Sequence, residues 1–273
     1  MKETKKNYLL VAQKAALDAG ALLLRSYGKL KNSQIHTKSK NDFVTELDKK
    51  SEKLIISAIK RSFPSHSIQG EESGLTQGSG VLWILDPLDG TANYIHQFPM
   101  FSVSIGVMAD GMLQAGVIYD PIHRELFSAS RGNGAYLNKK RMHVSKVKKL
   151  SDALMTTGIP FRGRNRFDAY MNSFRQISLA SSGMRRGGSA ALDLAYIACG
   201  RLDGFWEINL SAWDIAAGAI LVEEAGGKIS DLWGKPNYLT NGDVLASNGK
   251  IHAEIHAVTS NTLTPKILRI RKT

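Results

Sequence analysis

Hydrophobic positions in the first quarter of the chain follow the period of an α-helix. They predict a helix over residues 6–27 that stops at Gly28 and whose shared face carries Leu9, Ala12, Ala16, Ala19 and Leu23. A second helix is predicted after Thr45, which with Asp48 has the spacing of a capping box. Its expected buried stripe is Leu54, Ile55, Ala58 and Ile59, and Pro64 ends it.

The period then changes to that of β-strands. Residues 81–85 read as a buried strand that runs into a polar loop. Residues 101–108 and 112–119 predict two strands joined by a hairpin at Asp110-Gly111, and residues 125–130 continue the meander. Helices are expected near 166–180, 189–199 and 211–225, and strands at 204–207, 228–231 and 244–247. Interleaved helices and antiparallel hairpins favour a layered α+β fold over a doubly wound parallel sheet.

Composition adds little to this picture, but it excludes some classes of protein. The single cysteine, Cys199, excludes an intramolecular disulfide, and its apolar helical setting predicts a buried structural thiol. The apolar stretch from Tyr8 to Leu24 is interrupted by charged and amide side chains, which argues against a signal peptide or membrane span. We therefore expect a cytoplasmic protein.

The net charge is +12, and much of it is at the chain ends, in Lys2, Lys5 and Lys6 and in Arg269, Arg271 and Lys272. Such charge attracts nucleic acid, anionic membranes or phosphorylated metabolites without choosing among them. A solvated basic surface is favoured over a nucleic-acid site.

The chemistry is concentrated in residues 86–91, Asp-Pro-Leu-Asp-Gly-Thr, which follow the predicted buried strand. Two carboxylates held by a proline and a glycine can face one point, and oxygen ligands are those that Mg²⁺ prefers. Asp-Pro and Asp-Gly are also common turn formers, so this segment alone leaves both interpretations open.

Two other acidic segments favour the metal site. Glu71 and Glu72 lie between glycines before the strand, and Asp214 begins an otherwise apolar helix. Asp214 could equally be an acid of the first helical turn, stabilised by the helix dipole. Together the three segments supply enough carboxylates for two or three magnesium ions of the kind that assist phosphoryl transfer.

These motifs resemble the signatures of the inositol monophosphatase family. They are residues 70–73 (Gly-Glu-Glu-Ser), residues 83–91 (Trp-Ile-Leu-Asp-Pro-Leu-Asp-Gly-Thr), the Trp213-Asp214 pair and residues 223–227 (Glu-Glu-Ala-Gly-Gly). The similarity extends from the first helix to about residue 250. It implies one domain over residues 1–273, a layered αβαβα sandwich whose metal-binding half is about 1–150 and whose second half is about 151–273. It also implies a homodimer that needs Mg²⁺ and is inhibited by Li⁺.

The resemblance assigns metal coordination to Glu71, Asp86, the Leu88 carbonyl, Asp89 and Asp214. Catalysis is assigned to Glu71, and to Asp48 and Thr91 acting on the nucleophilic water. A threonine hydroxyl can accept a hydrogen bond from water while it donates one to a carboxylate, so this pairing is chemically reasonable.

Substrate contacts implied by the resemblance come from both halves of the chain: Asp89, Gly90, Thr91, Gly188, Ser189, Ala190, Glu207 and Asp214. Glu207 suits sugar-like hydroxyls, although it could be a plain acid at a strand end. Ala92 departs from the family pattern, in which many relatives carry a second threonine.

The expected substrate is a small phosphorylated metabolite, most simply inositol monophosphate. The alternatives within the superfamily are 3′-phosphoadenosine 5′-phosphate and fructose 1,6-bisphosphate. A haloacid-dehalogenase-type phosphatase is rejected because its two acids are two residues apart, whereas Asp86 and Asp89 are three apart. A role in binding RNA or transcription machinery is supported only by the net charge.

Overall fold

The structure, a computed structural model, describes residues 4–30, 33, 35–39, 42–160 and 164–263. Its helices are α1 (Lys5–Ser26), α2 (Glu46–Ser62), α3 (Thr91–Ile95), α4 (Arg164–Ala180), α5 (Ala190–Ala198), α6 (Ala212–Glu224), α7 (Tyr238–Asn241) and α8 (His252–Thr262), with a 3₁₀ turn, η2, at Leu150–Asp152. Among these residues, no helix is both long and apolar enough to cross a membrane.

The strands form three sheets. The smallest pairs β1 (Ile35–Ser39) with β2 (Asp42–Thr45). The largest has the order β10-β9-β8-β7-β6-β5-β3-β4 and contains β3 (Ser67–Gly70), β4 (Gly74–Thr76), β5 (Val81–Asp89), β6 (Ser102–Ala109), β7 (Met112–Asp120), β8 (Glu125–Ser130), β9 (Ala135–Leu137) and β10 (Lys140–Met142). The third has the order β12-β11-β13-β15-β14 and contains β11 (Leu154–Thr157), β12 (Gly183–Arg185), β13 (Gly204–Glu207), β14 (Lys228–Ser230) and β15 (Val244–Ser247).

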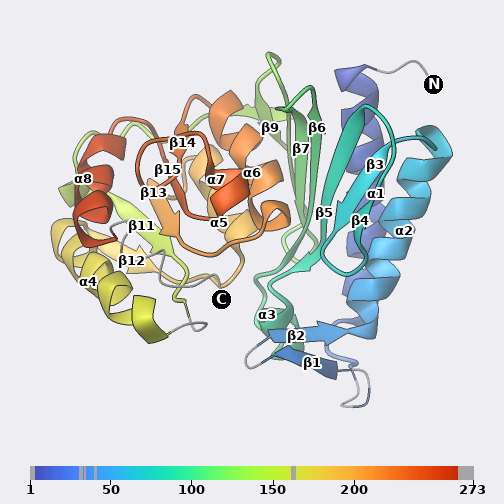
Figure 1. Cartoon of the computed structure of the whole chain (residues 1–273), viewed down its shortest axis with the longest axis horizontal. Helices are drawn as coiled ribbons and strands as arrows, with labels where there is room; N and C mark the ends of the chain where they lie inside the picture. Colours follow the sequence, from blue (N-terminus) through green and yellow to red (C-terminus); the bar gives the residue numbers. More distant parts are fainter. Residues whose placement is uncertain (1–3, 31–32, 34, 40–41, 161–163, 264–273) are drawn as a thin grey trace.

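Helices and sheets alternate in five layers (Figure 1). Helices α1 and α2 cover one face of the eight-stranded sheet, and α5 and α6 lie between its other face and the five-stranded sheet. Helices α4 and α8 cover the far side of that second sheet. The expected αβαβα sandwich is therefore confirmed.

Local sequence explains why the outer helices form where they do. Thr4 caps α1, since its hydroxyl accepts a hydrogen bond from the Asn7 amide at 3.2 Å. The predicted capping box of α2 is present: the Asp48 carboxylate accepts from the Thr45 amide at 2.8 Å, and the Thr45 hydroxyl accepts from the Leu47 amide. Such caps satisfy amide groups that have no partner inside the helix.

Successive side chains of a strand point to opposite faces of the sheet, so they enter different hydrophobic cores. In β5, Trp83 and Leu85 pack beneath α1 and α2, whereas Ile84 faces the core formed by α5 and α6. Burial of each such side chain contributes about 1.5–3 kcal/mol. The hairpin predicted at Asp110-Gly111 joins β6 to β7, and both residues have positive φ angles of 52° and 72°.

Two glycines bring α6 unusually close to the large sheet. Gly106 of β6 and Gly116 of β7 are paired across the strands. A Cβ atom added to Gly106 would lie 2.7 Å from Ala216 Cβ, and one added to Gly116 would lie 2.5 Å from Ile220 Cγ2. The absence of side chains at this pair therefore sets how closely α6 approaches the sheet.

The structure also differs from the sequence-based expectations. Strand β5 does not end at Leu85 but continues through Asp89, because the expected loop keeps pairing with β6 across a bulge. Helices α3, α7 and α8 and the short strands β1 to β4 and β9 to β12 were not predicted. All of these strands have five residues or fewer, which is too short for a hydrophobic period to emerge.

Candidate metal centre and cleft

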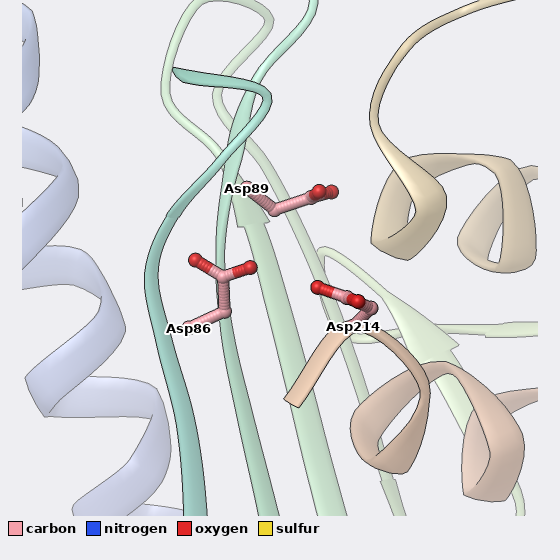
Figure 2. A group of neighbouring side chains, drawn as sticks. All are labelled: Asp86, Asp89 and Asp214. Carbon is pink, nitrogen blue, oxygen red and sulfur yellow. The ribbon is translucent and has the colours of Figure 1, made fainter. Parts of the chain in front are cut away.

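The bulge in β5 decides where the first two carboxylates point. Asp86 pairs with Ser104 and Asp89 pairs with Ser102, so three steps along β5 correspond to two along β6. In a regular strand, residues three apart face opposite sides of the sheet. The extra residue removes this offset, so both carboxylates lie on the side of the sheet from which Asp214 approaches, and that of Asp89 reaches the start of α5 (Figure 2).

Asp214 approaches them from the start of α6. One oxygen of its carboxylate accepts a hydrogen bond from the Ser211 amide at 2.7 Å, as expected for an acid in the first helical turn. The two sequence-based interpretations of Asp214 are therefore compatible, because the side chain caps the helix and also faces Asp86 and Asp89 (Figure 2).

These three aspartates form the one group among the described residues in which at least three side chains able to bind a metal converge. Each offers an oxygen, and the three oxygens lie within 4.8 Å of one another. Asp86 and Asp89 are buried, and Asp214 is half-buried. Three clustered carboxylates have the chemistry of a site for a hard divalent ion.

Glu71 lies beside this group but outside its tightest core. Its amide donates to the Leu85 carbonyl at 3.2 Å, which ties the turn after β3 to β5. Its charge is the main cause, after burial, of the raised pKa of Asp86. The Leu88 carbonyl, the remaining predicted ligand, accepts a hydrogen bond from the Thr91 hydroxyl at 3.0 Å.

Burial and mutual repulsion disfavour the charged forms of these groups. Burial, followed by the charges of Glu71, Asp89 and Asp214, raises the pKa of Asp86 well above its usual value. Burial likewise raises the pKa of Asp214, and it raises that of Asp89 to about 6 against hydrogen bonds that lower it. A bound cation would relieve this repulsion.

Asp48 and Thr91 are joined as the motifs imply. The Thr91 hydroxyl lies 3.2 Å from one Asp48 oxygen, while the other Asp48 oxygen is held by Thr45. Burial raises the pKa of Asp48 to about 6, and the hydrogen bonds from Thr45 oppose this shift. Gly90, with φ of 90°, turns the chain so that α3 begins at Thr91.

The second half of the chain closes the cleft around Asp89. Ser189 caps α5 and its hydroxyl also donates to Asp89, which accepts a further hydrogen bond from the Ala191 amide at 3.0 Å. Glu207 at the end of β13 lies against Gly158. Burial and the nearby Asp193 raise the pKa of Glu207 to about 8.

Together these groups line a cleft of about 420 Å³ between the two halves of the chain. Of the predicted site residues, the lining includes Glu71, Asp86, Leu88, Asp89, Gly90, Thr91, Gly188, Ser189, Ala190, Glu207 and Asp214. Asp48 is not in the lining and reaches the cleft only through Thr91.

Sequence reasoning missed several other residues that line the cleft, notably Asn93, Arg186, Asp193 and Asn209. The side-chain amide of Asn93 donates to the carbonyls of Met100 and Gly187 at 2.7 and 2.9 Å, which ties α3 to the segment before α5. Asp193 is buried and accepts from the Thr156 hydroxyl at 2.9 Å. The sequence could have indicated Asp193 as a site residue, because it is a lone acid in an apolar helix, as Asp214 is.

Two other expectations concern residues away from the cleft. Cys199 is half-buried at the end of α5 rather than fully buried, and burial raises the pKa of its thiol. Of the basic residues noted at the chain ends, Lys2, Arg269, Arg271 and Lys272 lie outside the described residues.

Comparisons with known sequences give consistent matches over nearly the whole chain. The pattern that defines the inositol monophosphatase family matches residues 5–264. The chain is 45% identical over 267 residues to the Nus factor SuhB of Pseudomonas aeruginosa, across 96% of the chain and 98% of that protein. It is 44% identical over 242 residues to an inositol-1-monophosphatase of Mesorhizobium japonicum, across 88% and 91%.

Solved structures agree with the layered arrangement. The extragenic suppressor protein suhB of Bartonella henselae superposes with a TM-score of 0.90 at 40% identity, covering 93% of the chain and 98% of that protein. An inositol monophosphatase from Anabaena superposes with a TM-score of 0.81 at 42% identity, covering 94% and 96%.

Proposed function

This chain belongs to the inositol monophosphatase family, and from that premise we propose that it is a Mg²⁺-dependent phosphatase of inositol monophosphate. The observation that carries the proposal is the convergence of Asp86, Asp89 and Asp214 within 4.8 Å at a cleft of about 420 Å³. A cleft of this size suits a small phosphate monoester.

The residues present fit a magnesium site. Asp86, Asp89 and Asp214 supply carboxylate oxygens, and Glu71 and the Leu88 carbonyl complete the proposed ligand set for two or three ions. When bound, Mg²⁺ would polarise the phosphate and lower the pKa of a coordinated water. The neighbouring amides, such as that of Ser211 on Asp214, hold the carboxylates in place.

Thr91 and Asp48 would orient the attacking water. The Thr91 hydroxyl has one proton and two acceptors in reach, Asp48 at 3.2 Å and the Leu88 carbonyl at 3.0 Å. If the Leu88 carbonyl serves as a ligand, the proton goes to Asp48, and the lone pairs of Thr91 can accept from water. This arrangement fixes the water and favours loss of its proton.

The substrate would lie between the two halves of the chain. Amides of Gly90 and Thr91, in the first turn of α3, have no acceptor within the helix and could bind phosphate oxygens. Asp89, Asp214, Glu207 and the stretch from Gly188 to Ala190 would contact the hydroxyl-bearing ring.

Two variants test the metal site. Asp86→Asn and Asp214→Asn should each lower turnover by about 10³-fold or more, because each removes a charge that the cations need. Asp110→Asn, in the exposed β6–β7 turn, is the control and should retain full activity. Isothermal titration with Mg²⁺ should show weaker binding in the two site variants alone. Full activity in a chelator would contradict the proposal.

A panel of substrates distinguishes members of the superfamily. Phosphate release should be fastest from inositol 1-phosphate, and slower from adenosine 3′,5′-bisphosphate and fructose 1,6-bisphosphate.

The stereochemistry at phosphorus tests how water attacks. With a phosphate made chiral by oxygen isotopes and sulfur, the configuration at phosphorus should invert, because one water attacks directly. Retention, or a trapped phosphoenzyme, would require a covalent mechanism.

Inhibition by Li⁺ and a homodimeric state are further expectations. Titration of the activity with Li⁺ tests the first, and light scattering tests the second.

A further inference from the structure

An unusually basic segment lies between β9 and η2 and contributes no residue to the lining of the cleft. Of the eleven residues from 139 to 149, seven are basic: Lys139, Lys140, Arg141, His143, Lys146, Lys148 and Lys149. All seven side chains are exposed. The segment contains β10, the edge strand of the large sheet, and then an irregular stretch that crosses toward the second sheet.

Two more exposed lysines extend this segment into a surface. The Lys250 ammonium group lies 3.5 Å from the Lys146 carbonyl, and Lys228 lies beside Gly249, the neighbour of Lys250. We call these nine residues the basic surface. No ion pair found among the described residues involves any of them.

The nearby acids are already engaged with other groups. Glu224 accepts hydrogen bonds from the amides of Gly132 and Gly134. Asp203 is buried and accepts from Ser145 and from the Leu154 amide. Two further acids, Glu254 and Asp152, accept from the Leu150 amide at 3.4 Å and from the Ser151 hydroxyl at 3.2 Å. None of these four acids forms an ion pair with the basic surface, whose eight lysine and arginine side chains outnumber them.

The shape of the basic surface suits a long anion better than a small one. None of its nine residues lines the cleft, so the substrate of the proposed phosphatase does not need it. Its cations follow one another along β10 and the irregular stretch after it rather than around a pocket. None of the large exposed hydrophobic side chains of the described residues belongs to it, which disfavours insertion into a membrane.

One end of the basic surface also carries a half-buried aromatic ring, Tyr136, covered on one face by an arginine. Arg141 of β10 is paired with Tyr136 of β9, and its guanidinium lies 5.9 Å from the centre of the tyrosine ring. Single-stranded nucleic acids are held by basic side chains along the backbone together with aromatic and arginine side chains that contact the bases.

We propose that the basic surface binds the phosphate backbone of single-stranded nucleic acid. Lysines dominate it, and lysines contact phosphates rather than read base edges, so binding should depend little on sequence. This role is separate from hydrolysis in the cleft, and each can fail without the other.

The test compares two variants with equal loss of charge. In the first, Lys140, Lys146, Lys148 and Lys149 are changed to Gln. In the matched control, four exposed cations of α1 and α2 and the residues after α1, namely Arg25, Lys29, Lys53 and Arg61, are changed to Gln. Each variant lowers the net charge from +12 by four.

Binding to a labelled 20-nucleotide single-stranded RNA is followed by fluorescence anisotropy between 50 and 200 mM salt. The first variant should bind about tenfold or more weakly at 100 mM salt, and the slope of log affinity against log salt should fall by about 3. The control should bind within about twofold of the unmodified protein. Both variants should retain phosphate release, which shows that they fold.

Several outcomes would overturn the proposal. Equal weakening in both variants would mean attraction by net charge alone, and an absence of RNA binding at 50 mM salt would exclude the role. Tighter binding to a duplex of the same sequence would contradict a single-stranded ligand. Binding to vesicles of phosphatidylserine, lost in the first variant, with no RNA binding would assign the surface to a membrane instead.

Discussion

Thr91 and Asp48 are held together by one hydrogen bond, and both would act on the same water. We predict that Thr91→Ala and Asp48→Asn each lower kcat by about 10²–10⁴-fold. The double variant should be little worse than either single variant, because two residues that act as a unit give non-additive losses. Steady-state kinetics at saturating Mg²⁺ measure this, and fully additive losses would show that the residues act independently.

Glu207 should recognise hydroxyl groups and take no part in the chemistry. Glu207→Ala should lower turnover of inositol 1-phosphate about 10- to 100-fold, since a buried hydroxyl contact would be lost. Turnover of para-nitrophenyl phosphate, which has no ring hydroxyls, should change by less than about threefold. Equal losses on both substrates would place Glu207 on the metals or on the phosphate.

At the scale of an element, α2 fixes three parts of the site with one face. Asp48 contacts Thr91, the Ser51 hydroxyl donates to the Pro87 carbonyl at 3.0 Å, and Glu52 accepts from the Glu72 amide at 3.0 Å. These three residues lie three and four positions apart, which places them on the same side of a helix. Helix α2 therefore orients the Glu71 turn, β5 and Thr91 together.

Glu52 provides the test of this role. It is 2% exposed, and its carboxylate occupies the space that a Cβ atom on Gly70 would need. Glu52→Ala should weaken Mg²⁺ binding about 10- to 100-fold, because the turn that carries Glu71 loses its anchor. Glu52→Gln keeps an acceptor and should restore most of the affinity, while Lys53→Gln, exposed on the same helix, should change nothing. Unchanged titration of Glu52→Ala with Mg²⁺ would refute this.

At the scale of the whole molecule, the distance between α6 and the large sheet sets the position of Asp214. Gly116→Ala would force a Cβ within 2.5 Å of Ile220 and should lower the free energy of unfolding by about 1–3 kcal/mol. Weaker Mg²⁺ binding should accompany this loss. Gly183→Ala, where a Cβ would make an ordinary 3.4 Å contact with Leu154, is the control for denaturant unfolding. Equal stability of the two variants would contradict this account.

Stability should also depend on pH through His252. This buried imidazole lies 3.0 Å from the hydroxyls of Ser230 and Ser247, and burial lowers its pKa to about 4. Because the unfolded chain has the ordinary pKa of about 6.5, it binds the proton first as pH falls. His252 therefore lowers the free energy of unfolding as the pH falls from about 6.5 to 4, by about 3 kcal/mol in total. Above pH 6.5 this loss is absent and the stability is fully present.

Denaturant unfolding at several pH values between about 4 and 6.5 measures the slope of the free energy of unfolding against pH. His252→Gln should remove this contribution from the slope and leave the opposite contributions of buried carboxyls with raised pKa values, such as Asp48, Asp89 and Glu207. His143→Gln, at an exposed histidine, should leave the slope unchanged. A slope in His252→Gln equal to that of the unmodified protein would show that His252 does not contribute.

The sequence by itself determined the features that depend on near neighbours. The capping box of α2, the hairpin at Asp110-Gly111 and the helices α4, α5 and α6 all follow from local patterns. Motif resemblance then indicated the αβαβα sandwich and its acidic site residues, because residue types at fixed spacing carry the chemistry of the family.

Only the tertiary structure decided which of these residues meet and in what orientation. The bulge that turns Asp86 and Asp89 toward one side depends on pairing with β6, which no local period encodes. Asp193 has the same sequence signal as Asp214, yet it lines the cleft as the acceptor of a hydrogen bond from Thr156, while Asp214 joins the acidic group. The reason is physical: spacing along a chain fixes the face on which a side chain lies, whereas its partners depend on how distant layers pack.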